Sequence, residues 1–311
     1  MKVLSLFDGI SCGRVALERA GIPVEAYDAF EIDAPAITIS ENNYPDITHH
    51  GDVFNGDFTQ FKGHDLLIGG SPCTYWSIAQ RNRETTSSGI GFDLFMQYSR
   101  ALTESRCEWF LYENNNSIHP DIKHEISREL GVKPVMINSS LVSAQYRKRC
   151  YWTNIPNVQQ PEDKGMTLQG ILENGLAFRD KSYAYTTRCQ AGTIEDTMKR
   201  HRHTMVAVPY GSSGQAPMME PVERMKRIRS TDRIYEVKNG EITLMNGTTH
   251  PIRLPDGYYS FRRLTPMEAE RLQTLPDGYT EGVPNTQRYK CIGNGWTVNV
   301  ITHILTGLAG Q

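Results

Sequence analysis

The chain has 311 residues, of which 39% are hydrophobic and 22% are charged, and its formal net charge is -2. This composition is that of an ordinary globular protein, and the length allows one large α/β domain or a large domain with a smaller one. No stretch of about 18 apolar residues is present, and Asp8 and Gly9 interrupt the short apolar start. The sequence therefore predicts no membrane span and no signal peptide, and it favours a cytoplasmic protein.

The cysteines are scattered along the chain. They stand at positions 12, 73, 107, 150, 189 and 291, with no C-x-x-C pair and no His/Cys cluster at zinc spacing. This distribution predicts neither a metal site nor a disulfide framework, and it favours free thiols in a reducing compartment.

The charge is unevenly distributed. Residues 1–70 contain 4 Lys and Arg against 11 Asp and Glu, whereas residues 181–233 contain 10 against 5. The basic clusters at 199–203 and 224–229 suit contact with nucleic-acid phosphates, whose neutralisation dominates affinity. The alternative is a solvated helix face, which charge runs usually form.

The first 155 residues alternate short apolar runs with segments of helical spacing. This alternation predicts an α/β fold with a doubly wound, mostly parallel sheet and helices on both faces. The expected strands are 3–7, 24–30, 65–68, 109–112, 135–138 and 150–153, and the expected helices are 13–20, 92–102 and 122–130.

Residues 156–260 differ from what precedes them. They are rich in Gly, Pro, Ser, Thr and Asn. Two β-like runs, 233–238 and 241–245, flank an Asn239-Gly240 pair that is typical of a hairpin turn. We expect a smaller, irregular domain that contains β-strands.

Helical character returns after this region. Thr265 is a predicted helix cap and Pro266 a first helical residue, followed by a helix over 267–275. The apolar spacing of 297–308 predicts a last helix that packs on the first domain. The expected regions are 1–155, 156–260 and 261–311.

Reactive side chains follow two of the expected strands. Cys73 ends a Gly-Gly-Ser-Pro-Cys run after the strand at 65–68, and Glu113 follows the strand at 109–112. Because parallel strands place their carboxyl ends at one sheet edge, a thiol and an acid are predicted to meet there as nucleophile and proton donor. Taken alone, a cysteine in such a chain is more often a small buried hydrophobe.

A second group suits a nucleotide-like ligand. Gly9 and Gly13 allow a tight turn between the first strand and its helix, and Glu31 follows the second strand, where such folds hold ribose hydroxyls. The G-x-G-x-x-G fingerprint of dinucleotide-binding oxidoreductases is absent. For Glu31 and Asp52, the alternative is an ordinary surface carboxylate.

The order of these motifs resembles that of the DNA cytosine-5 methyltransferases of the standalone bacterial or phage type, over nearly the whole chain. The shared motifs are Phe7-Asp8-Gly9, Glu31, Asp52, the loop that ends at Cys73, Glu113-Asn114, Gln145-Tyr146-Arg147-Lys148-Arg149, Arg263-Leu264-Thr265-Pro266 and Gly293-Asn294-Gly295. The resemblance implies the class I methyltransferase fold. It also implies methyl transfer from S-adenosylmethionine, which becomes S-adenosylhomocysteine, to C5 of a cytosine in a specific sequence of double-stranded DNA.

The resemblance further implies which residues hold the cofactor. Phe7 is expected against the adenine, Glu31 on the ribose and Asp52 on the adenine amino group. The full set expected in the cofactor site is Phe7, Gly9, Gly13, Glu31, Asp52, Leu94, Asn294, Trp296 and Val298.

The chemistry assigns roles to the reactive residues. Cytosine C5 is too weak a nucleophile to take a methyl group unaided, but addition of the Cys73 thiolate to C6 produces an enamine with a nucleophilic C5. Glu113 is expected to hydrogen-bond or protonate N3, and Arg149, with Arg147 nearby, to hold the base carbonyl. The base must leave the stacked duplex to reach them, with residues 74–88 as the expected clamp.

Residues 156–260 occupy the place of the family's target-recognition region. Basic side chains there are expected to contact phosphates, and a few others to read base edges. The residues expected at the DNA are Ser77, Arg81, Arg83, Gln145, Arg188, Arg227 and Arg229. We expect a monomer, and a cognate restriction endonuclease acting separately is a compatible partner.

Three places depart from the family pattern. Ser11 and Cys12 stand where glycine is common, Thr74-Tyr75-Trp76 where Gln-Gly-Phe is common, and Asn115 where valine is usual. Two alternatives stay open. One is an RNA cytosine methyltransferase, since one branch of the family acts on transfer RNA. The other is a catalytically silent homologue, which the joint presence of the cysteine, the acid and the arginine disfavours.

Overall fold

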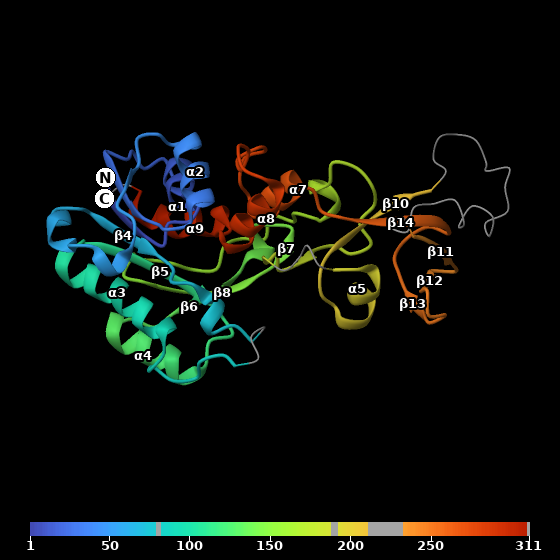
Figure 1. Ribbon diagram of the computed structural model, residues 1–311, viewed down its shortest axis with the longest axis horizontal. Helices are drawn as coiled ribbons and strands as arrows, with labels where there is room; N and C mark the ends of the chain where they lie inside the picture. The colour runs from blue at the N-terminus through green and yellow to red at the C-terminus, as the bar shows by residue number, and fades with distance from the viewer. Residues whose placement is uncertain (79–81, 188–191, 211–232, 310–311) are drawn as a thin grey trace.

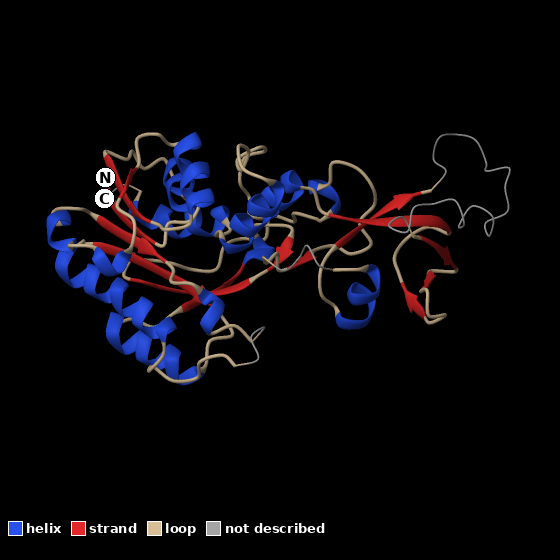
Figure 2. Ribbon diagram, viewed as in Figure 1, coloured by secondary structure: helices blue, strands red, loops and turns tan. Residues whose placement is uncertain are grey.

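The computed structural model describes residues 1–78, 82–187, 192–210 and 233–309. Figures 1 and 2 show a larger part, which contains the N-terminus, and a smaller part made mainly of strands. Within the described residues, no helix is both long enough and apolar enough to cross a membrane.

The larger part is built on a seven-stranded sheet with the order β3-β2-β1-β4-β5-β8-β6. Neighbours from β3 to β5 are parallel, whereas β8 runs antiparallel to both β5 and β6. The strands are β1 (Lys2–Leu6), β2 (Ala26–Phe30), β3 (Thr48–His49), β4 (Leu66–Gly69), β5 (Trp109–Asn115), β6 (Val135–Asn138) and β8 (Lys148–Thr153). The predicted doubly wound, mostly parallel sheet is confirmed.

Helices cover both faces of this sheet (Figure 1). In β4, Leu66 and Ile68 belong to one core cluster and Leu67 to the other, because successive strand side chains point to opposite faces. The first cluster includes residues of α1 (Cys12–Arg19), α2 (Ala34–Asn43) and α9 (Val298–Leu305), and the second includes residues of α3 (Ile90–Ser105) and α4 (Pro120–Leu130). The last helix, α9, therefore packs on the same face of the sheet as α1 and α2.

The smaller part is an antiparallel sheet with the order β10-β14-β11-β12-β13, beside the short helix α5 (Ile194–Arg200). Its strands are β10 (Met205–Pro209), β11 (Ile234–Lys238), β12 (Glu241–Thr243), β13 (Thr249–Pro251) and β14 (Gly257–Arg263). Asn239 and Gly240 both have positive φ, as the two-residue turn of the predicted hairpin requires. The chain leaves the sheet at Arg263, beyond the composition boundary at 260.

A third group of elements joins the two parts. β7 (Gln145–Tyr146) pairs with β9 (Ser182–Tyr183), and α7 (Pro266–Leu272) and α8 (Asn285–Asn294) share a core cluster with residues of both sequence regions. Thr265 accepts a hydrogen bond from Glu268 N, and the Glu268 side chain accepts from Thr265 N. This capping box starts α7 at Pro266, as predicted.

Candidate active site

A cavity of about 430 Å³ lies at the carboxyl ends of the parallel strands. Its wall combines the loop after β1, the residues after β2, the loop after β4, Glu113 on β5 and the segment 293–296. A second cavity of about 400 Å³ adjoins it, and Cys73, Thr74 and Arg149 line both. Segments far apart in the sequence therefore meet at one sheet edge, where open α/β folds bind ligands.

The loop after β1 follows an unusual backbone course where it lines this cavity. Phe7, Gly9 and Ser11 all have positive φ, at 57°, 61° and 57°. Gly9 N donates a 2.8 Å hydrogen bond to Glu31 Oε2, and Glu31 Oε1 accepts from the backbone of the two residues that follow it. Burial raises the pKa of Glu31, although these hydrogen bonds act in the opposite direction.

The Asp8 side chain holds the same loop through hydrogen bonds. Its carboxylate accepts hydrogen bonds from Ser5, Ser11 and Tyr27, at 2.5 to 2.7 Å. Burial is nevertheless the largest effect and raises the pKa of Asp8. Ser11, which stands where the family commonly has glycine, thus adopts a left-handed conformation and is stabilised by this hydrogen bond.

The remaining residues expected at the cofactor divide into two groups. Asn294 and Trp296 line the cavity, and so does Ile32, which is 72% exposed. Asp52 caps a short 3-10 helix by accepting from Phe54 N, outside the cavity lining. Ile32 was not predicted from sequence, although an exposed apolar residue directly after a strand-end carboxylate is a usable signal.

Three other residues expected at the cofactor lie outside the cavity lining, namely Gly13, Leu94 and Val298. Leu94 packs with Phe7 on one core cluster, and Val298 is fully buried at the start of α9. A Cβ atom on Gly13 would lie 2.3 Å from Ile68 Cδ1, so α1 packs closely on the sheet here and the Ile68 side chain would have to shift to admit a larger residue.

Cys73 opens the 3-10 turn η3 (Cys73–Tyr75), directly after Pro72. Its carbonyl accepts from Trp76 N at 3.1 Å. The Trp76 indole is fully buried and donates to Glu84, whose carboxylate accepts from Gly91 N in the first turn of α3. The residues Trp76 and Glu84 therefore fix both sides of the loop after Cys73.

Glu113 lies opposite the cysteine loop on β5. Its side chain is buried, and Arg149 Nε lies 2.8 Å from Oε1 as an ion pair, while Trp296 Nε1 donates a 2.9 Å hydrogen bond to Oε2. The Arg149 contact with Oε1 lacks hydrogen-bond geometry, so Oε1 accepts no hydrogen bond from the described residues. A buried acceptor with spare capacity faces a position where a ligand donor is favourable.

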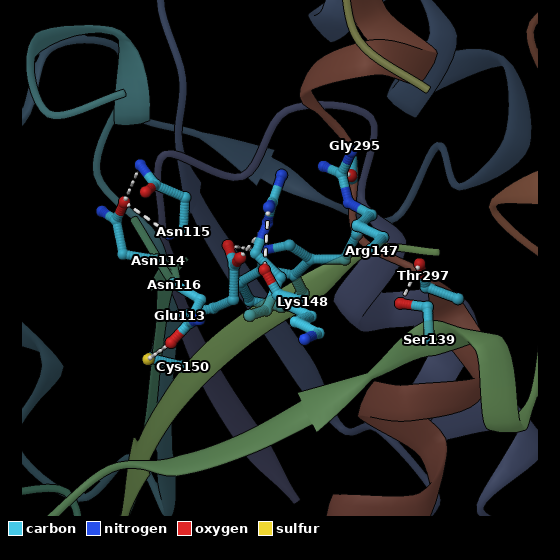
Figure 3. Close-up of polar contacts among 12 residues, drawn as sticks. Glu113, Asn114, Asn115, Asn116, Ser139, Arg147, Lys148, Cys150, Gly295 and Thr297 are labelled. Carbon is cyan, nitrogen blue, oxygen red and sulfur yellow. Dashed lines mark hydrogen bonds and ion pairs between the residues drawn. The ribbon is translucent and has the colours of Figure 1, made fainter. Parts of the chain in front are cut away.

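The side chains of 145–149 alternate between two directions, and Gln145, Arg147 and Arg149 share the inner one. The Arg147 guanidinium donates to the carbonyl of Tyr185 at 2.7 Å and to that of Gly295 at 3.0 Å. Figure 3 shows Arg147 beside Gly295. Burial, with Arg149 second, lowers the pKa of Arg147 to about 10. Arg147 therefore joins wall segments of the cavity, and Arg149 alone of this pair contacts Glu113.

Gln145 was expected at the DNA, and the structure contradicts this. The side chain is fully buried, donates to Leu272 O at 2.6 Å and accepts from Tyr185 N at 3.0 Å. Its place in a charged motif suggested exposure, but strand alternation turns it toward α7.

Two of the other residues expected at the DNA, Ser77 and Arg83, lie within the described part of the chain. Ser77 lines the second cavity, and Arg83 Nη1 donates to Ser117 O at 2.6 Å. Arg81, Arg188, Arg227 and Arg229 lie outside the described residues.

The strand order, the single antiparallel strand and the cavity at the carboxyl edge define a class I methyltransferase fold with an added antiparallel domain. Solved structures of similar fold include the Entamoeba histolytica methyltransferase EhMeth, with a TM-score of 0.66, 14% identity and coverage of 99% of this chain and 97% of that one. A putative DNA modification methyltransferase from an E. coli prophage has a TM-score of 0.62 at 20% identity, with 99% and 98% covered.

The family model for C-5 cytosine-specific DNA methylases matches residues 1–309, so the chain belongs to this family. It is similar to the Type II methyltransferase M1.ScrFI of Lactococcus lactis subsp. cremoris, at 26% identity over 96% of this chain and 76% of that protein. It is also similar to M.HhaI of Haemophilus parahaemolyticus, at 23% identity over 98% and 93%. The protein is a DNA cytosine-5 methyltransferase, and enzymes of this family and fold use S-adenosylmethionine.

Proposed function

We propose that this enzyme methylates cytosine through a covalent bond between Cys73 and C6 of a base flipped out of the duplex. The observation that supports this most directly is that Cys73 and Arg149 line both of two adjoining cavities, while Glu113, which is ion-paired with Arg149, lines the first of them. One cavity also contains the loop after β1, and the other opens toward the loop after the cysteine. Cofactor and base can therefore approach the same thiol from different sides.

Each residue has a distinct part in this chemistry. The Cys73 thiolate adds to C6, which moves an electron pair toward C5 and N3. Glu113 Oε1, buried and without a hydrogen-bond donor among the described residues, receives or supplies the proton at N3. Arg149 neutralises the carboxylate and offsets charge that develops on the base. After transfer, loss of the C5 proton and cleavage of the S–C6 bond regenerate the cysteine.

The cavity residues fit the proposed cofactor. S-adenosylmethionine supplies an electrophilic methyl group when it is bound. Glu31 keeps lone pairs available for ribose hydroxyls beyond its three backbone contacts, and Phe7 and Ile32 offer apolar surface to an adenine ring. Asn294 and Trp296 would close the pocket near the reacting groups.

We propose that residues 156–260 recognise the target sequence in double-stranded DNA. The basic balance of this region supports phosphate contact, and the antiparallel sheet with α5 offers surfaces for reading base edges. Since relatives of this chain are bacterial and phage enzymes, we propose that it acts in the cytoplasm of a bacterial or phage-infected cell. We also propose that it acts as a monomer. A restriction endonuclease, where one exists, would act separately.

Expression in a methylation-deficient bacterium tests this proposal. Base-resolution conversion sequencing of the genomic DNA should show 5-methylcytosine in one motif with the intact protein and none with Cys73→Ala. Unmodified DNA in both would overturn the proposed DNA specificity, and a parallel assay on transfer RNA would identify the other substrate class. Cys73→Ser should abolish transfer yet retain S-adenosylmethionine binding by calorimetry, and a Cys73→Ser enzyme that still turns over would refute the nucleophile assignment.

A further inference from the structure

Trp296 connects the cofactor cavity to the proposed acid. Its indole lines that cavity, and its Nε1 donates a 2.9 Å hydrogen bond to Glu113 Oε2. Arg149 approaches the same carboxylate at the other oxygen, Oε1, at 2.8 Å. Arg149 thus contacts one oxygen of the Glu113 carboxylate and Trp296 the other. Together these two contacts fix the orientation of the carboxylate plane as well as its position.

The backbone around Trp296 is held by buried polar groups on both sides. On one side, Gly295 O accepts from Arg147 Nη2 and from Gln273 Nε2, each at 3.0 Å. On the other, Thr297 Oγ1 donates to Gln273 Oε1 at 3.0 Å and accepts from Ser139 Oγ at 2.9 Å (Figure 3). Fully satisfied buried networks of this kind are rigid, so the indole is delivered to one place.

Glycine at position 70 leaves room for this contact. A Cβ atom there would lie 2.8 Å from the backbone oxygen of Glu113, 3.2 Å from its Oε2 and 3.4 Å from Trp296 Nε1. The closest of these is a backbone atom that cannot rotate away. The loop before Cys73 therefore packs directly against the Trp296 and Glu113 pair.

We propose that Trp296 is a positioning residue. Its N–H occupies Oε2 and so leaves Oε1 as the oxygen presented to the target base, since Oε1 is ion-paired with Arg149 but accepts no hydrogen bond from the described residues. This inference rests on the proposed role of Glu113. It assigns Trp296 a task in the activation of cytosine, in addition to the cofactor contact expected from its position in the chain.

Exchange of tritium from C5 of cytosine separates the two tasks, because it requires no methyl donor. Cys73 adds to C6, C5 takes a proton from water, the original tritium leaves C5, and the S–C6 bond breaks. The substrate is a duplex that contains the mapped motif with [5-³H]cytosine at the target position. Trp296→Phe should slow exchange by about 10-fold to 100-fold, the effect of losing a hydrogen bond to a charged group.

Two further variants make the result specific. In a Glu113→Gln background, Trp296→Phe should slow exchange by less than about 2-fold further, because the group it positions is already altered. Trp152→Phe is the matched control: Trp152 is also buried and donates through its indole, to Ser127 Oγ at 2.9 Å, but it lines neither cavity. It should exchange at the wild-type rate.

If Trp296→Phe exchanges tritium at the wild-type rate and only its KM for S-adenosylmethionine is raised, the inference is overturned and Trp296 has a cofactor role alone. Equal slowing by Trp296→Phe in the wild-type and Glu113→Gln backgrounds would also overturn it. If Trp296→Phe does not fold, Trp296→Leu also removes the indole N–H and should slow exchange in the wild-type background but not further in the Glu113→Gln background. A wild-type enzyme that neither methylates nor exchanges would instead refute the proposed function.

Discussion

Glu270 on α7 offers the clearest test of how the buried polar groups stabilise this fold. Its side chain is fully buried, accepts hydrogen bonds from Gly278 N at 2.8 Å and Thr280 N at 2.9 Å, and also accepts from the Thr280 hydroxyl. Arg288 Nη2 lies 2.8 Å from Oε1. Tyr279, within the turn so held, donates to Ile10 O in the loop that lines the cavity.

Glu270→Ala removes every one of these acceptors and leaves a largely buried guanidinium unpaired. Breaking a buried ion pair in this way costs about 3 to 5 kcal/mol, and each stranded buried N–H adds about 1 to 3 kcal/mol where water cannot reach it. We expect the free energy of unfolding to fall by about 5 kcal/mol. Glu270→Gln keeps one acceptor oxygen and the shape, so about 3 kcal/mol is expected.

Urea unfolding followed by tryptophan fluorescence measures both losses as shifts of the midpoint at constant slope. Glu281→Ala is the matched control in the same turn, because Glu281 is exposed and should change stability by less than about 0.5 kcal/mol. If the free energy of unfolding of Glu270→Ala lies within about 1 kcal/mol of the wild-type value, the buried partners left without an acceptor do not destabilise the fold as argued.

Three further predictions concern the site itself. Arg149→Lys should lower kcat by about 10-fold to 100-fold in a steady-state methylation assay, because a point charge cannot reproduce the guanidinium contact with Glu113; an unchanged kcat would count against it. Burial raises the pKa of Cys12 to about 12, so only about one thiol in 10,000 is ionised at pH 8; mass mapping after iodoacetamide should therefore find Cys73, which is only partly buried, labelled well before Cys12. Gly293→Ala should reduce activity and stability together, since its Cβ would lie 2.5 to 2.7 Å from backbone atoms of 186–187, and a fully active, equally stable variant would contradict that.

Much of the larger part could be predicted because local pattern and tertiary environment agree there. The runs at 65–68 and 135–138 are short and apolar and became β4 and β6, and the Thr265-Pro266 start of α7 follows from capping chemistry alone. α2, in contrast, was not predicted, because its sequence contains Thr and Ile residues that favour strands. Packing of Ala36 and Ile39 on the sheet made it helical.

The sequence by itself determined the chemistry available: a cysteine, an acid and an arginine at strand ends, in an order that indicates the family. Only the tertiary structure decided which arginine contacts Glu113, that Gln145 points inward, and that the Trp296 indole reaches the carboxylate. The physical reason is that strand positions fix the sheet edge at which a residue lies. The direction of its side chain depends on register with β5 and on the buried groups of α7 and 293–297, which are distant in sequence.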